Sequence, residues 1–120
     1  MKTQTTGKWG ELQARNFLES HGLEFIQSNY LTRMGEIDLI MRDGDTLVFT
    51  EVRTRNTERY GGGIASVTKA KQRKLCRAAL SYLQTNRQME HPCRFDVVAI
   101  NTDNSSTTFE WIKNAFDYTG

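Results

Sequence analysis

Alternation of apolar and polar residues is clearest along residues 35–53. Apolar or β-branched side chains occupy every second position from Ile37 to Met41 and again from Val48 to Val52, which is the pattern of two β-strands. Asp43-Gly44-Asp45 lies between them and favours a tight turn, because glycine accepts a positive φ and aspartate hydrogen-bonds its own backbone. The sequence therefore predicts a β-hairpin near the middle of the chain.

Three acidic residues interrupt the two arms of this hairpin, namely Glu36, Asp38 and Glu51. Directly opposed residues of an antiparallel pair share a face of the sheet. If Gly44-Asp45 is the two-residue loop, Asp38 lies opposite Glu51. If Asp43-Gly44 is the loop, Glu36 lies opposite Glu51 and Asp38 is diagonal to it on the same face. A one-residue slip would send the acids to opposite faces.

The converging acids indicate a metal site. Arg53 lies two residues after Glu51, so it belongs to the same face of the strand. Carboxylates this close repel one another strongly unless a cation lies among them. Mg²⁺ is the natural candidate, with Mn²⁺ as its substitute, because Mg²⁺ binds through one or two carboxylates together with water and substrate phosphates.

The rest of the chain predicts two helices and three more strands. The second helix connects the hairpin to a later strand, so it acts as a crossover that should make this strand parallel to residues 46–53. We predict one α/β domain over residues 1–120, with a central mixed sheet flanked by helices in the order α-β-β-β-α-β-β. The expected elements are helices at Trp9–His21 and Val67–Leu83 with Ser66 as the second N-cap, and strands at 23–30, 94–100 and 107–112.

The two ends of the chain predict little regular structure. We expect residues 1–6 to be frayed. Residues 113–120 should close as a helical turn, with Phe116 and Tyr118 packed down on the core.

Positive charge is concentrated between residues 53 and 77. This segment holds eight Lys or Arg residues and one acid, a net charge of +7 within a chain of net charge +2. Such asymmetry indicates a polyanionic partner, although a solvated surface would give the same pattern. The residues expected to contact a nucleic-acid backbone are Arg53, Arg55, Arg59, Lys69, Lys71, Arg73 and Lys74.

Two parts of this basic segment differ from the rest. Residues 54–65 contain three consecutive glycines and no periodicity, so we expect a mobile basic loop. Lys71 lies four residues before Leu75 and seven before Ala78, on the apolar side of the second helix. Its long stem could cover apolar surface and bring the ammonium to a site, or could carry it out to solvent. The spacing alone leaves both interpretations open.

Composition excludes several classes of protein. The chain has 120 residues, of which 38% are hydrophobic and 25% charged, as in a folded domain and unlike a disordered chain. We find neither an apolar run of membrane-spanning length nor a signal peptide, so we expect a cytoplasmic protein. Cys76 and Cys93 lack CxxC spacing, and His21 and His91 lack metal-type spacing, so we expect two reduced, buried cysteines.

Five segments together resemble a known family. They are GEIDLI at 35–40, FTEVRTR at 49–55, WGELQARNFLESHG at 9–22, VTKAKQRKL at 67–75 and RFDVVAI at 94–100. The combination is similar to the YraN-like family of small, uncharacterised bacterial proteins, over nearly the whole chain. More broadly, it resembles the PD-(D/E)XK superfamily of restriction endonuclease-like nucleases, and within it the archaeal Holliday-junction resolvases.

The resemblance implies a restriction endonuclease-like fold with a divalent-metal site. It implies Asp38 and Glu51 as metal ligands, helped by the backbone carbonyl of Val52. Arg53 stands where the superfamily has a lysine, and it cannot help to deprotonate water because arginine stays protonated. A lysine on the second helix matches a polar position that often contributes to such sites. The implied catalytic residues are therefore Glu11, Asp38, Glu51, Arg53 and Lys71.

Three functions remain open at this point. The first is a Mg²⁺-dependent endonuclease acting on structured or branched DNA. The second is a non-catalytic nucleic-acid-binding module on the same fold. The third is a protein-interaction domain whose acids only form ion pairs with Arg53 and Arg55. The resolvases act as dimers, so the resemblance allows a homodimer, although no residue pattern here indicates an interface.

Overall fold

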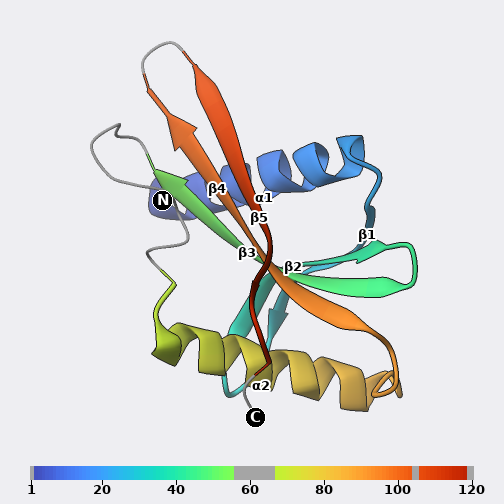
Figure 1. Ribbon diagram of the computed structural model, residues 1–120. Helices are drawn as coiled ribbons and strands as arrows, with labels where there is room; N and C mark the ends of the chain where they lie inside the picture. The colour runs from blue at the N-terminus through green and yellow to red at the C-terminus, as the bar shows by residue number, and fades with distance from the viewer. Residues whose placement is uncertain (1, 56–66, 104–105, 119–120) are drawn as a thin grey trace.

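The computed structural model describes residues 2–55, 67–103 and 106–118, with side chains from residue 7 onward. The elements follow the predicted order α-β-β-β-α-β-β (Figure 1). They are α1 (Lys2–Ser20), β1 (Glu24–Leu31), β2 (Glu36–Asp43), β3 (Thr46–Arg55), α2 (Lys69–Thr85), β4 (Cys93–Thr102) and β5 (Thr107–Phe116). The predicted α/β class is confirmed, and the arrangement is consistent with a nuclease-like fold.

The sheet lies between the two helices, and each of its faces has a hydrophobic core of its own (Figure 1). Leu75 of α2 belongs to the same cluster as Phe49, while Leu18 of α1 belongs to the cluster of Val48. Val48 and Phe49 are neighbours in β3, and they reach opposite cores because successive side chains of a strand alternate between faces. All four side chains are at most 2% exposed. The alternation seen in the sequence thus decides which helix each residue meets.

The strand order is β1-β2-β3-β4-β5. β3 and β4 are parallel, from Leu47–Cys93 to Arg55–Asn101, and every other neighbouring pair is antiparallel. The prediction that the second helix is a crossover between parallel strands is therefore confirmed. β2 and β3 pair from Asp43–Thr46 to Leu39–Thr50, which makes Gly44-Asp45 the two-residue loop. This is the first of the two registers that the sequence allowed.

Both helices begin at residues other than those expected. α1 begins at Lys2, so its backbone includes residues that we expected to precede the helix. α2 begins at Lys69, and its N-cap is Thr68 where we expected Ser66. The Thr68 hydroxyl accepts a hydrogen bond from the Lys71 N–H at 3.1 Å, which is the usual way in which a threonine satisfies the first turn of a helix.

Strands β3 and β5 are longer than expected. β3 continues to Arg55, so the loop predicted at 54–65 can begin only after it, and residues 56–65 lie outside the described residues. β5 continues to Phe116, which makes the predicted helical turn at 113–120 wrong. The reason is long-range pairing: the ladder with β4 reaches Phe95–Phe116, and these two rings stack with centroids 4.9 Å apart. Tyr118, which we expected to pack down, is 50% exposed.

Cys76 and Cys93 are not joined by a disulfide. Cys76 is buried, as expected, whereas Cys93 is partly exposed. Neither helix that the structure describes combines the length and the apolar character that crossing a bilayer requires.

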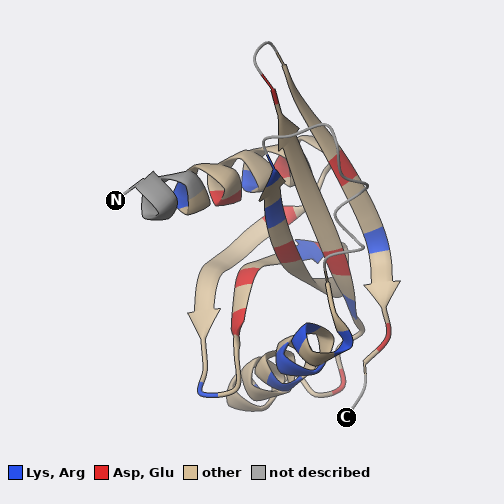
Figure 2. Ribbon diagram, turned by 90° about the vertical axis from the view of Figure 1, so that its left-hand side faces the viewer, with Lys and Arg blue, Asp and Glu red and all other residues tan. Residues whose placement is uncertain are grey.

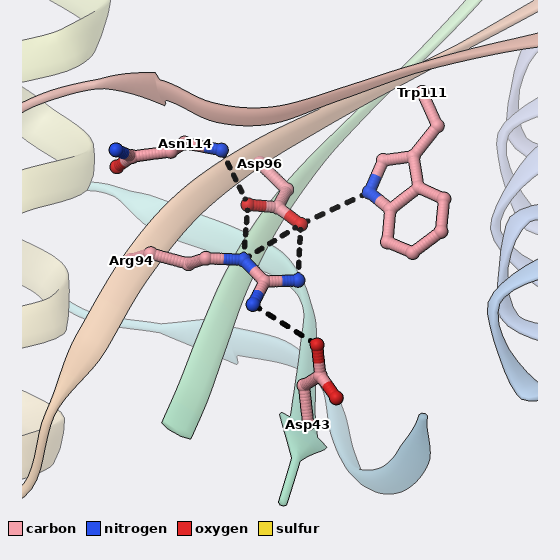
Figure 3. A network of polar contacts seen from close by, with 5 residues as sticks. All are labelled: Asp43, Arg94, Asp96, Trp111 and Asn114. Atoms are coloured by element: carbon pink, nitrogen blue, oxygen red, sulfur yellow. Dashed lines mark hydrogen bonds and ion pairs between the residues drawn. The ribbon is translucent and has the colours of Figure 1, made fainter. Parts of the chain in front are cut away.

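A buried polar network attaches β5 to β4 and to the hairpin turn (Figure 3). Asp96 is 0% exposed, and its carboxylate accepts hydrogen bonds from Arg94 Nε at 3.0 Å, from the Trp111 indole N–H at 2.9 Å and from the Asn114 backbone N–H at 3.0 Å. Arg94 also donates to Asp43 at 3.0 Å. A buried carboxylate is costly unless it is paired and hydrogen-bonded, and here it has both kinds of partner. The network therefore holds the last strand in register.

Replacing Asp96 by alanine should destabilise the fold strongly. The change leaves the guanidinium of Arg94 and the indole N–H of Trp111 without their buried acceptor, and breaking a buried pair in this way costs about 3–5 kcal/mol. Urea unfolding of Asp96→Ala and the wild type measures the loss. Glu110→Ala, at an exposed position of β5, is the matched control and should change stability by less than about 0.5 kcal/mol. Equal effects of the two substitutions would contradict this account of the network.

Candidate functional site

The sheet divides between β2 and β3, and the candidate site lies at the division. The ladder between these strands ends at Leu39–Thr50. Beyond it, β2 remains paired with β1 as far as Leu31–Glu36, and β3 remains paired with β4 as far as Arg55–Asn101. Figure 1 shows β3, β4 and β5 running on together while β1 and β2 diverge from them. Moving away from the hairpin turn, the next residue beyond this last pair is Asp38 on β2 and Glu51 on β3.

Asp38 takes the place of a ladder partner for β3. Its Oδ2 accepts a hydrogen bond from the Val52 backbone N–H at 2.8 Å. The pKa of Asp38 is raised to about 7, mainly by burial and next by the negative charge of Glu51, while the Val52 N–H opposes both by stabilising the carboxylate. The charges of Glu11 and Glu36 add smaller increases. Three other carboxyl groups therefore act on Asp38 at the division of the sheet.

Glu51 faces α2 and is almost completely buried, with 3% exposure. Its Oε2 accepts a hydrogen bond from Arg53 Nη1 at 3.0 Å and lies 3.8 Å from Lys71 Nζ. Its Oε1 is buried and has no hydrogen-bond partner among the described residues. A buried carboxylate oxygen without a partner is costly, so it is a position at which a cation or donor would be stabilised.

Glu11 reaches the same site from α1, which covers the opposite face of the sheet from α2. Gly10, which is buried, allows the close approach, because a Cβ at this position would collide with the Thr54 hydroxyl of β3. Asn29 of β1 then donates hydrogen bonds from Nδ2 to Glu11 at 2.9 Å and to Glu36 at 3.1 Å. Asn29 has a φ of 54°, a left-handed conformation that asparagine tolerates better than most residues. Its amide thus holds two of the acids beside Asp38.

The structure brings together all five residues that the family resemblance implied as catalytic. Glu11 and Glu51 both act on Asp38 electrostatically, and Arg53 and Lys71 both pair with Glu51. The sequence left the direction of the lysine open, and the structure places its ammonium on the site. Sequence reasoning missed Asn29; its signal was an asparagine near the end of a predicted strand, where this residue type is unfavourable.

Three of the seven expected nucleic-acid contacts lie on the exposed side of α2. Lys69, Arg73 and Lys74 are exposed there, and Figure 2 shows basic positions gathered along this helix. Arg55 is at the end of β3, where it lines a hollow of about 320 Å³ together with Val52, Arg53 and Thr54. Arg59 lies outside the described residues. The described basic residues thus extend from the acids along α2 and along the end of β3.

The donor set suits a divalent cation. No group of three or more His, Cys, Asp or Glu side chains within the described residues is arranged to hold a metal ion by itself. Mg²⁺ does not need such a group, because it commonly binds one or two carboxylates and completes its shell with water and phosphate oxygens. A cation would relieve two features: the Oε1 of Glu51, which has no hydrogen-bond partner within the described part of the chain, and the repulsion of Asp38 by the neighbouring carboxyls.

The fold is that of an α/β protein with a five-stranded mixed sheet and two helices, and it is consistent with a nuclease-like architecture. The chain belongs to the uncharacterised protein family UPF0102, which matches residues 10–100 and is the YraN-like family that the sequence resembled. It is 54% identical over 112 residues to a UPF0102 protein of Ectopseudomonas mendocina, covering 92% of this chain and 93% of the relative.

Two further relatives belong to the same family. A UPF0102 protein of Legionella pneumophila is 47% identical over 116 residues, covering 96% of this chain and 97% of the relative. One of Nitrosomonas eutropha is 49% identical over 115 residues, covering 96% of each chain. The three matches extend over more than nine-tenths of this chain, so they cover the helices and strands that carry the candidate site.

The raised pKa of Asp38 predicts how stability depends on pH without divalent cations. The folded protein binds this proton more tightly than the unfolded chain does, so the contribution is complete below about pH 4 and is lost as the pH rises through about 7. Asp38→Asn keeps an acceptor for the Val52 N–H but cannot titrate. The wild type should lose on the order of 2–4 kcal/mol more than this variant between pH 4 and pH 8.

Urea unfolding at several pH values in a chelating buffer measures this difference. Asp45→Asn, at an exposed position of the hairpin turn, is the control and should follow the wild type. Superimposable profiles for Asp38→Asn and the wild type would mean that the carboxyls do not act on Asp38 as the structure indicates.

Proposed function

We propose that this protein is a divalent-metal-dependent endonuclease that hydrolyses phosphodiester bonds of structured or branched DNA. The observation that carries the proposal is the pair of adjacent acids at the division of the sheet. Asp38 has a raised pKa, and Glu51 has a buried oxygen without a partner among the described residues. Titratable groups with perturbed pKa values beside specific charged partners occur preferentially at functional sites.

Asp38 and Glu51 are the side chains that would hold Mg²⁺ or Mn²⁺, together with the Val52 backbone carbonyl. The cation would supply Lewis-acid chemistry, polarising a phosphate oxygen and lowering the pKa of a water molecule. Asp38 is preorganised for this role because the Val52 N–H fixes its Oδ2 at 2.8 Å. Glu11 adds negative charge from α1, and Asn29 keeps it in place.

Arg53 and Lys71 supply the positive charge of the site. Both contact the same oxygen of Glu51, at 3.0 Å and 3.8 Å, so their charges lie beside the acids that would hold the cation. Arg53 cannot exchange a proton and can only stabilise negative charge on the phosphate. The ammonium of Lys71 can donate hydrogen bonds, so Lys71 is the residue for orienting the attacking water. Lys71 of α2 would thus take the role that the superfamily gives to a lysine at the position of Arg53 in β3.

The basic surface supports a nucleic-acid substrate. The exposed Lys69, Arg73 and Lys74 continue the positive charge of Lys71 along α2, and Arg55 continues it along β3. Charges of this kind contact phosphates and position the duplex without reading its sequence. Binding should therefore depend on salt and on DNA shape more than on base sequence.

A non-catalytic nucleic-acid-binding module is the second candidate. It is favoured by the ion pair between Arg53 and Glu51, because an arginine that neutralises a potential ligand could replace the cation. In that case the acids stabilise the fold and the basic surface binds DNA. A protein-interaction domain is the third candidate, and it predicts no binding to any nucleic acid.

Cleavage of a labelled branched DNA in Mg²⁺ tests the proposal. Asp38→Ala should reduce the rate by about 100-fold or more, since it removes a ligand of the cation that would stabilise charge on the reacting phosphate. Lys71→Ala should reduce it similarly, whereas Lys71→Arg should keep DNA binding and lose cleavage. Asp45→Asn is the control and should cleave like the wild type.

The other outcomes separate the alternatives. Salt-sensitive DNA binding that survives Asp38→Ala, with no cleavage in Mg²⁺ or Mn²⁺, would contradict the endonuclease and leave the binding module. Failure to bind DNA or RNA at low salt would contradict both and leave the interaction domain.

A further inference from the structure

A hollow of about 200 Å³ lies between α1 and β1, beside the acids. One wall is a single face of α1, because Lys8, Glu11 and Arg15 recur at helical spacing and all line the hollow. Phe25 and Ser28 of β1 form part of the opposite wall. The hollow is smaller than the roughly 300–1,000 Å³ of pockets that take drug-sized ligands, so it suits one ring system.

Arg15 gives this hollow a flat, charged surface. Its Cζ lies 3.7 Å from the centroid of the Phe25 ring, and its Nε lies 3.3 Å from Glu19 Oε2. The guanidinium is therefore held at two points, by a cation–π contact and by an ion pair one turn along the helix. A guanidinium plane supported in this way can stack against a second flat group.

The hollow is continuous with the candidate site. Glu11 and Asn29 belong to its lining and are hydrogen-bonded to each other at 2.9 Å. Glu11 in turn acts on Asp38. Lys8, which is exposed, lies about one helical turn before Glu11, where it could meet a phosphate next to a bound ring.

We propose that this hollow binds one unpaired nucleobase of the substrate, stacked on the guanidinium of Arg15. The proposal rests on the proposed function and specifies its substrate class as DNA with an unpaired nucleotide beside the duplex. Unstacked bases bind to aromatic rings and arginine planes, and every base offers such a face. The Ser28 hydroxyl and the Glu11 carboxylate provide hydrogen-bonding groups for the edge of the base.

Fluorescence anisotropy without divalent cations tests this inference apart from cleavage. Two labelled DNAs of equal length and charge are compared, a continuous duplex and one with an unpaired nucleotide. The wild type should bind the second about tenfold more tightly, within the range that stacking of one base supplies. Arg15→Lys keeps the charge and loses the plane, so the ratio of the two affinities should fall to about one.

Ser28→Phe is a second variant that acts without altering Arg15. It places a ring in the hollow from an exposed position of β1, and it should also abolish the preference. The matched control is Arg33→Lys, at an exposed arginine beside α2, which should keep the wild-type ratio.

Each remaining outcome is decisive. Equal affinity of the wild type for the two DNAs would overturn this inference and leave the proposed function standing. A preference that survives both Arg15→Lys and Ser28→Phe would also overturn it. Absence of binding to either DNA at low salt would overturn the proposed function together with the inference.

Discussion

The pairing of β2 with β3 depends on the two-residue turn at Gly44-Asp45. Gly44 has a φ of 63°, which such a turn requires and which glycine adopts without strain. This turn sets Asp43 opposite Thr46, and the same register continues to Leu39 opposite Thr50, so Asp38 and Glu51 come next to each other just beyond the last pair. Because side chains alternate with a period of two, a turn longer by one residue would send the two acids to opposite faces. The geometry of the site therefore begins in the turn at the other end of the hairpin.

This register brings the carboxyl groups of Asp38 and Glu51 together in a site that is largely buried from water. Burial and the charge of Glu51 together raise the pKa of Asp38 to about 7. Arg53 and Lys71 compensate on one side only, since both contact Oε2 of Glu51 while Oε1 has no partner among the described residues. Uncompensated buried charge destabilises a fold unless something else binds there, so the arrangement is suited to a ligand of positive charge. The same acids that weaken the apo fold would hold the cation.

The sequence predicted the features that depend on local pattern. Periodicity and turn chemistry predicted the hairpin and the crossover to a parallel strand. They also limited the hairpin to two registers with a two-residue loop, one of which the structure has. The sequence could not predict the features that depend on contacts between distant residues. The hydrogen bonds of Asn29 to two acids require β1 and α1 to be in place, and the continuation of β5 through Phe116 requires the ladder with β4. The burial of Asp96 is of the same kind, because its partners come from two strands.

Calorimetric titration with Mn²⁺ tests most directly whether Asp38 and Glu51 form one cation site. Mn²⁺ prefers the same oxygen ligands as Mg²⁺ and binds protein sites more strongly. We predict that the wild type binds one Mn²⁺ and that Asp38→Asn and Glu51→Gln each weaken binding by about tenfold or more, while Asp45→Asn does not change it. Undiminished Mn²⁺ binding by both Asp38→Asn and Glu51→Gln, or no binding by the wild type, would contradict the account.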